Sequence, residues 1–405
     1  MRPAILIAIL AAVLGLEVWQ AAVTPTWAID EPLWFRKAQA TSAHTADPDD
    51  RFYAIDVPGL NRWIYWPMFR ITGLYKVPPG EPECWSLRDG RIYFEESFTN
   101  PRWPVNVSQE AFQTWIHRRG RYAPRSSIMA LRLVNIAVYG VMLAALWYAA
   151  RAALKSPWLA VLAVCPVALV PAFNVNVAFV VWSGDIFALA MLAVALAVWM
   201  RYHLKGQTAS RSAILVISIL CGLATASKLN GVLVLFAYLT YLAICSNGLS
   251  RLTNPLVAGL IAFATFLAVD PVVFLYPDKA PWQVLSLMVT RRMQVAADWT
   301  RREGPLGWSQ ILSLAIFWWP LVPVAVWAFW RQRRARWFLP LALWCAFNLV
   351  GTLAGVLEVN RADDEYMAQA YMALFFPVAV AIIALGTQNP EAEADRRLSQ
   401  SPPAQ

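Results

Sequence analysis

The adjacent acids Asp30 and Glu31 are the residues of this chain best suited to proton transfer. They follow the first apolar stretch, where a long polar loop begins. Two neighbouring carboxylates repel each other when both are ionised, so we expect one of them to have a raised pKa and to exchange a proton near neutral pH. The alternative interpretation is that both acids are solvated and only cap the helix that follows them.

Further ionisable residues lie at the ends of apolar stretches: Asp185, Lys228, Asp270 and the run 361–365. A charge near a bilayer is costly unless it faces a cavity or a partner. These groups therefore indicate a site at one membrane face if the fold gathers them at one depth with Asp30. Each also has a simpler explanation, because Asp185 can cap a helix, Asp270 can end one, and Lys228 can extend its side chain to the membrane surface.

The composition assigns the chain to the membrane, because 59% of its residues are hydrophobic and only 15% are charged. Its mean hydropathy is +0.47, which is typical of an integral membrane protein. Apolar runs near the roughly 20 residues that cross a bilayer predict an all-α polytopic protein with about ten transmembrane helices. These runs cover residues 3–23, 128–150, 158–173, 186–200, 213–226, 231–245, 255–274, 309–330, 337–357 and 370–385.

Two of the predicted helices have alternative interpretations. The first run has features of a signal peptide, but Glu17 and Trp19 interrupt its later part and no clean cleavage pattern follows, so we expect a retained helix. The segment 213–245 is interrupted only by residues 227–230, which leaves open whether it forms two short helices or one broken helix.

Basic residues occupy alternate short loops: Arg151 and Lys155; Arg201, Lys205 and Arg211; Arg251; and Arg331, Arg333, Arg334 and Arg336. The positive-inside rule places these loops in the cytoplasm. The opposite segments then face the periplasm or an equivalent lumen: 24–127, 174–185, 227–230, 275–308 and 358–369. Much of the net charge of +9 is explained by this asymmetry, so it does not require a nucleic-acid partner.

We expect one transmembrane domain over residues 1–387 and a disordered cytoplasmic tail over 388–405. The long outer loops, 24–127 and 275–308, are predicted to lie on the membrane surface as lids. Within the first, clustered aromatic residues flanked by arginines predict an interfacial helix over 61–72. Spacings typical of zinc sites, phosphate-binding loops, dinucleotide sites or nucleophile elbows do not occur in the sequence.

The order of these motifs resembles the membrane glycosyltransferases of the GT-C fold, specifically relatives of protein O-mannosyltransferases and of aminoarabinose transferases that act on lipid A. An Asp-Glu pair follows the first helix in that group, and Asp30-Glu31 with Trp34 is similar to it. The stretch 222–231, which contains Lys228, resembles the family's glycine-leucine-alanine motif ending in lysine. The segments 58–73 and 130–136 are also similar to family motifs.

Two more family positions lie farther along the chain. Asp185 matches an aspartate often found at the start of the fourth helix, and residues 363–371 resemble the start of a late helix. Glu365 stands where the family usually has arginine, so a phosphate-binding role is not carried over to that position. Asp56-Val57 stand where a histidine or lysine often precedes the family's proline.

The resemblance implies an inverting transfer of a sugar from a polyprenyl-phosphate donor to a lipid, glycan or protein acceptor at the outer face. Asp30 would be the general base, and Glu31 would position the acceptor or tune that base. Lys228 would neutralise the departing phosphate, because a cation favours the charge that develops there. Further candidates are Arg62, Arg291 and Arg292 for the donor phosphate, and Trp34, Asp185, Asp363 and Tyr366 for substrate contacts.

The expected partners are membrane lipids, the polyprenyl-phosphate sugar and a glycolipid, glycan or protein acceptor, in a bacterial inner membrane with the site facing the periplasm. No cofactor is expected. Metal dependence stays open, because isolated acids could recruit a divalent cation, but no ligand set is evident and chelation is expected to leave activity in place. The competing classes are a transporter or flippase for lipid-linked sugars, for which internal repeats and broken helices are not evident, and a noncatalytic lipid-binding subunit. Hexosyl and pentosyl transfer both stay open.

Overall fold

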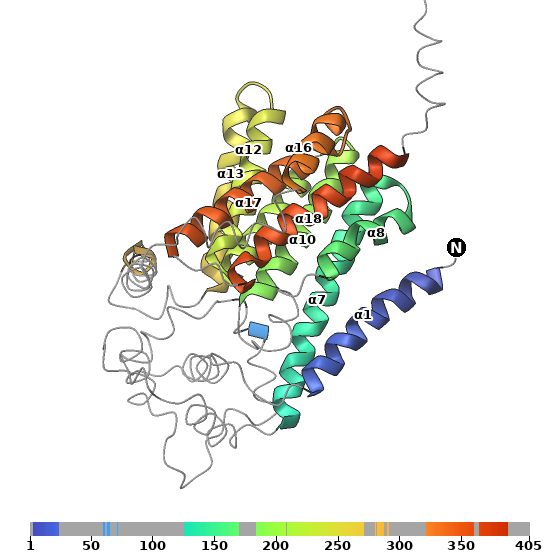
Figure 1. The fold of residues 1–405 in the computed structure, drawn as a ribbon. Helices are drawn as coiled ribbons and strands as arrows, with labels where there is room; N and C mark the ends of the chain where they lie inside the picture. Colours follow the sequence, from blue (N-terminus) through green and yellow to red (C-terminus); the bar gives the residue numbers. More distant parts are fainter. Residues whose placement is uncertain are drawn as a thin grey trace, which may run out of the picture.

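The computed structural model describes residues 3–23, 125–169, 184–207, 209–270, 321–359 and 364–387, with short pieces at 60, 63–64, 71, 280, 282–286 and 290. All regular structure in this part of the chain is helical, and no strand occurs there. The helices are α1 (Pro3–Val23), α7 (Arg125–Leu154), α8 (Pro157–Ala168), α10 (Gly184–Leu204), α11 (Arg211–Ser227), η1 (Leu229–Gly231), α12 (Val232–Cys245), α13 (Ser250–Val269), α16 (Leu321–Gln332), α17 (Phe338–Val359) and α18 (Asp364–Thr387) (Figure 1).

Every predicted apolar run overlaps one of these α-helices. Within the described residues, four stretches are long and apolar enough to cross a membrane: Arg132–Leu154, Asp185–Leu204, Ser250–Val269 and Met367–Thr387. Shorter apolar helices accompany them at Pro157–Ala168, Arg211–Ser227, Leu229–Cys245 and Phe338–Ala354. The helices support an integral membrane protein. The predicted count of about ten spans stays a prediction, since the four candidate spans are those of the described residues alone.

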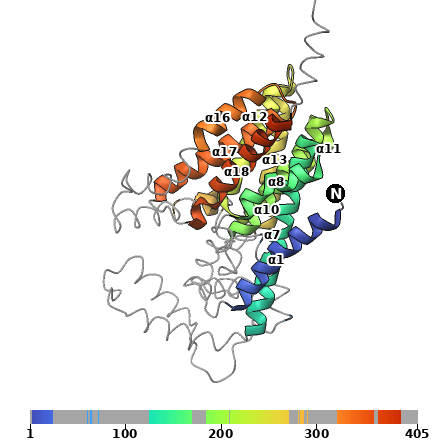
Figure 2. The same cartoon turned by 45° about the vertical axis from the view of Figure 1, so that its right-hand side comes forward.

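The bundle is organised around α10, which packs between α7 and α11. Within the apolar window of this helix 67% of the residues are buried, whereas only 17% are buried in that of α13. Large apolar side chains such as Leu256 and Leu260 are exposed on α13, as expected for a surface that faces lipid. Helix α1 lies along α7 at the edge of the bundle (Figures 1 and 2). The most buried helix therefore carries Asp185 at its start.

The segment 213–245 forms two helices, α11 and α12, separated by η1. Lys228 interrupts them, because its extended backbone (φ −158°, ψ 138°) cannot continue a helix. Gly231 lies against the backbone of Ala224, so that a side chain at this position would overlap the Ala224 carbonyl. The chain can fold back tightly here because glycine has no Cβ.

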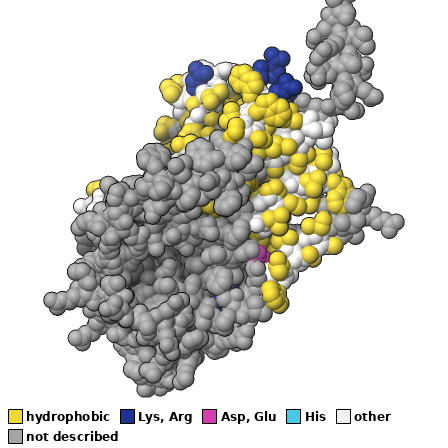
Figure 3. Space-filling model, in the orientation of Figure 1, with side chains coloured by type: hydrophobic (Ala, Val, Ile, Leu, Met, Phe, Trp, Pro, Cys, Tyr) yellow, Lys and Arg dark blue, Asp and Glu magenta, His cyan; other side chains and the backbone are white. Residues whose placement is uncertain are grey.

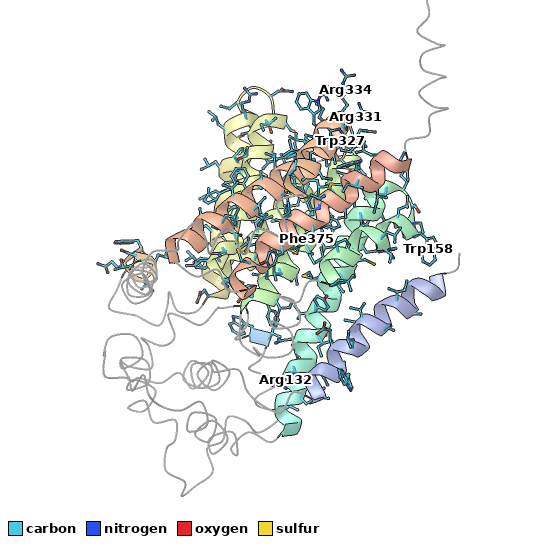
Figure 4. The ribbon with its side chains drawn as sticks, viewed as in Figure 1. Arg132, Trp158, Trp327, Arg331, Arg334 and Phe375 are labelled. Atoms are coloured by element: carbon cyan, nitrogen blue, oxygen red, sulfur yellow. The ribbon has the colours of Figure 1, made fainter. Side chains whose placement is uncertain are left out.

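The basic loops meet at one end of the bundle, which we call the basic end and define by Lys155, Lys205, Arg251 and Arg331. Figure 4 labels Arg331 and Arg334 at this end, and Figure 3 shows Lys and Arg side chains there above a described face that is largely hydrophobic. The His203 ring connects α10 to this end, because its Nδ1 lies 2.6 Å from the Tyr241 hydroxyl and its Nε2 contacts the Arg336 carbonyl. The arrangement agrees with the predicted alternation of loops.

One predicted outer loop is shorter than expected. Residues 358–369 are expected to form a loop because they lie between the predicted apolar runs 337–357 and 370–385, but α17 continues to Val359 and α18 begins at Asp364. Charged and polar residues are compatible with the first turn of a helix when that turn lies at the membrane surface. The loop assignment was therefore wrong for most of this segment, and Tyr366 belongs to α18.

Candidate functional site

Asp185 and Lys228 form an ion pair, in which the Lys228 ammonium donates to Oδ1 of Asp185. The two residues are 43 positions apart in the sequence. Their side chains retain only 17% exposure for Lys228 and 11% for Asp185. Two of the candidate residues predicted separately from the sequence are thus brought into direct contact, mostly shielded from the surroundings.

The helix ends explain why the two charges meet. Asp185 lies in the first turn of α10, where the helix dipole favours a negative charge, and Lys228 follows the last turn of α11, where it favours a positive one. The short connection 205–210 makes α10 and α11 a packed hairpin, so the start of the first lies beside the end of the second. Each charge is compensated by its partner and by its own helix.

Asp270 lies at the same end of the bundle, directly after α13. It is 2% exposed, and its N–H donates to the Phe266 carbonyl at the end of the helix. The predicted role of this residue as a helix terminator is confirmed, and its burial places a third ionisable side chain beyond the reach of bulk water. We call the end of the bundle defined by Asp185, Lys228 and Asp270 the site end.

Part of the first predicted outer loop reaches the site end. The indole Nε1 of Trp63 donates to the Val269 carbonyl at 2.9 Å, and Ile64 packs against the hydrophobic core. Ile71, by contrast, is 79% exposed. The described residues of 61–72 are helical, in agreement with the predicted interfacial helix. Trp63 therefore fixes this segment beside the last turn of α13.

Sequence reasoning gave too little weight to a polar face on α7. Arg132, Asn135 and Tyr139 are all buried and are spaced so that they share one side of the helix. Figure 4 shows Arg132 toward the start of α7, away from the basic end. Glu17 of α1 is buried beside this face, with its Oε2 lacking a hydrogen-bond partner. The signal was available, since a helical spacing of polar residues within an apolar run is uncommon.

Most other candidate residues lie outside the described part of the chain: Asp30, Glu31, Trp34, Arg62, Arg291, Arg292 and Asp363. For Tyr366 the structure describes the backbone, within α18. The proposed base and its neighbour therefore stay sequence-based predictions, and the ion pair is the part of the candidate site whose geometry is described.

Among the described residues, no group of three or more His, Cys, Asp or Glu side chains could hold a metal ion. The four described cysteines, Cys165, Cys221, Cys245 and Cys345, are free thiols. What the described site offers chemically is a lysine ammonium that is paired with the Asp185 carboxylate. An anionic ligand can compete with that carboxylate for the lysine, because both bind through charge-assisted hydrogen bonds.

Residues 112–274 match the family model described as dolichyl-phosphate-mannose-protein mannosyltransferase. The matched stretch runs from α7 to α13 and includes both members of the ion pair. This match confirms the predicted resemblance and supports a membrane glycosyltransferase of the GT-C type. A search of curated proteins found no match to this chain.

Proposed function

We propose that this protein transfers a sugar from a polyprenyl-phosphate donor to an acceptor hydroxyl at the membrane surface, and that the Asp185–Lys228 pair belongs to the donor-phosphate site. The observation that carries this proposal is the placement of the pair, where the start of α10 lies beside the end of α11 and inside the stretch that matches the mannosyltransferase model. A shielded lysine at the end of a membrane bundle is suited to a lipid-linked anion.

The proposed reaction is an inverting displacement. Asp30 accepts the proton of the acceptor hydroxyl as that oxygen attacks the anomeric carbon, and the bond from this carbon to the phosphate oxygen breaks on the opposite face. The new glycosidic bond forms as polyprenyl phosphate leaves. Glu31 positions the acceptor or tunes Asp30, because a second carboxylate next to the base changes its proton affinity.

Lys228 contributes most when the donor bond breaks. The leaving phosphate gains negative charge in the transition state, so a fixed ammonium stabilises the transition state more than the bound donor. Asp185 keeps the ammonium oriented and neutralised before the donor arrives, and yields part of the interaction to the phosphate. The remaining proposed contacts are Arg62, Arg291 and Arg292 toward the phosphate, and Trp34, Asp363 and Tyr366 toward the substrates.

The proposed orientation follows from charge. The basic end lies in the cytoplasm by the positive-inside rule, so the site end faces the periplasm of a bacterial inner membrane. The transferred group is a hexose or pentose, and the acceptor is a lipid, glycan or protein. No cofactor is part of the proposal. The alternatives are movement of the lipid-linked sugar across the membrane without transfer, and noncatalytic binding of that lipid.

The test is transfer of radiolabelled sugar from a panel of polyprenyl-phosphate sugars to membrane extract, with purified wild type and Asp30→Asn compared at equal folding and expression. We expect the wild type to label an acceptor with at least one donor and the variant to lose this activity. Equal labelling by both would remove Asp30 as the base. Flipping of labelled lipid across a vesicle bilayer without any transfer would favour the transporter.

A further inference from the structure

A network of side-chain amides lies beneath the turn that carries Lys228. Gln369 of α18 donates through Nε2 to Oδ1 of Asn348 on α17 at 2.8 Å, and to the Asn230 carbonyl in η1 at 3.4 Å. Asn230 is two residues beyond Lys228. A side chain from the last helix is thus bonded to the turn that interrupts α11 and α12.

The amides are buried in an apolar bundle. Gln369 is 7% exposed and Asn348 is 0% exposed. Buried polar groups are costly unless they are hydrogen-bonded, and this holds most strongly where lipid and helices exclude water. Buried amides of this kind can fix the arrangement of the helices that they connect. The partners of their hydrogen bonds therefore indicate which segments they position.

The network also reaches the helix that carries Asp185. Asn348 donates through Nδ2 to the Trp344 carbonyl at 2.7 Å, and the Trp344 indole donates to the Leu192 carbonyl of α10 at 3.3 Å. Trp344 is completely buried. The chain of contacts therefore connects η1, α18, α17 and α10, which include the elements on both sides of the ion pair.

Lys228 depends on this support because its own backbone is not helical. It lies between the last hydrogen bond of α11, from the Lys228 N–H to Ala224, and the tight bond from the Gly231 N–H to the Lys228 carbonyl at 2.7 Å. Small rotations of such a turn swing a long side chain by large distances. Within this turn, the Gln369 amide donates a hydrogen bond to the Asn230 carbonyl.

We propose that Gln369 is a positioning residue for Lys228: by holding the Asn230 carbonyl it sets the direction of the ammonium toward Asp185 and toward the donor phosphate. This inference rests on the proposed donor-phosphate role of Lys228. Gln369 itself does not touch the substrate in this proposal. Its effect on transfer passes entirely through the turn.

The first test compares Gln369→Met with a matched control, Gln332→Met. Gln332 is also buried, at 2% exposure, but it ends α16 at the basic end. Hydrogen–deuterium exchange of the full-length protein in nanodiscs should rise in peptides covering residues 228–233 for Gln369→Met and stay at the wild-type level for Gln332→Met. Unchanged exchange in Gln369→Met would overturn the proposal.

The second test is a double-mutant cycle in sugar transfer. Gln369→Met should lower kcat/KM for the donor about tenfold, as expected when one buried hydrogen bond to a positioned group is lost. In a Lys228→Met background the same substitution should have no further effect, whereas Gln332→Met should leave kcat/KM for the donor unchanged in either background. Additive effects of Gln369→Met and Lys228→Met would refute action through Lys228.

The outcomes separate this inference from the proposed function. A wild-type kcat/KM for the donor in Lys228→Met would remove the phosphate role of Lys228, while the exchange measurement would still decide whether Gln369 holds the turn. If Gln369→Met does not fold, Asn348→Leu removes the same network from its other side and is judged by the same exchange and coupling results.

Discussion

The interaction between Asp185 and Lys228 is a structural ion pair, and we propose that the same lysine also binds the donor phosphate. Both side chains are largely shielded, so leaving either charge without a partner is costly. A lysine that must also meet a phosphate therefore benefits from a carboxylate that holds it in place until the ligand arrives. The two roles can be separated by experiment, because stability and sugar transfer are measured independently.

Lys228→Met is expected to lower kcat for sugar transfer by about 10²-fold, because one preorganised charge at the leaving group is removed. Steady-state transfer kinetics measure this effect.

Asp185→Asn should lower the free energy of unfolding by an amount on the order of 2 kcal/mol, since the lysine loses its charged partner. Thermal unfolding in detergent measures this effect.

The exchanged double variant, Asp185→Lys with Lys228→Asp, is the control for pairing alone. It preserves opposite charges at the two positions, so part of the lost stability should return, although each charge now opposes the dipole of its own helix. Transfer should stay low, because the cation now belongs to α10. Full recovery of transfer would show that pairing, rather than the location of the lysine, is what the reaction needs.

At the scale of the elements, the packing of α11 against α13 depends on Gly222. A Cβ at this position would lie 2.5 Å from the Ala262 carbonyl and 2.7 Å from the Thr265 Cβ, which are too close for any real contact. The two helices approach through this glycine, and their separation sets where the turn at Lys228 lies. The family-like stretch 222–231 thus begins and ends with a glycine that packing requires.

Gly222→Ala should destabilise the protein by about 1–3 kcal/mol, because the added methyl forces α11 and α13 apart. Gly259→Ala on α13 is the matched control, since its added Cβ would meet nothing within 4 Å. The control should leave stability unchanged or raise it by up to about 1 kcal/mol through better helix propensity. Thermal unfolding measures the stability of both variants. Equal changes in stability for Gly222→Ala and Gly259→Ala would contradict this account.

The helices were more predictable than the contacts between them. Apolar run length located every described α-helix, because crossing a membrane requires that length. It misplaced the loop around Asp364, because the polar first turn of α18 lies outside the apolar run. The meeting of Asp185 and Lys228 depends on how the α10–α11 hairpin packs, which periodicity alone does not specify. Gln369 and Asn348 gave no signal, since isolated amides in apolar runs have no characteristic spacing.

At the scale of the whole molecule, the reaction is proposed to run without metal. The charge that this proposal sets against the leaving phosphate is the Lys228 ammonium. Transfer activity should therefore survive dialysis against EDTA with less than about a twofold loss, since no Lewis acid is needed when a fixed cation meets the phosphate. Loss of activity that Mg²⁺ or Mn²⁺ restores would contradict this prediction.

The orientation of the bundle determines which compartment the reaction serves. Asn247, between α12 and α13, is exposed at the basic end, and Ile71 is 79% exposed in the segment that Trp63 anchors at the site end. With the native cysteines replaced, Ile71→Cys should react with a membrane-impermeant maleimide in intact spheroplasts, whereas Asn247→Cys should react only in inverted vesicles. This expectation follows from the positive-inside rule, which predicts that the basic loops lie in the cytoplasm. The reverse pattern would place the ion pair on the cytoplasmic side, where the donor would be met before it is flipped.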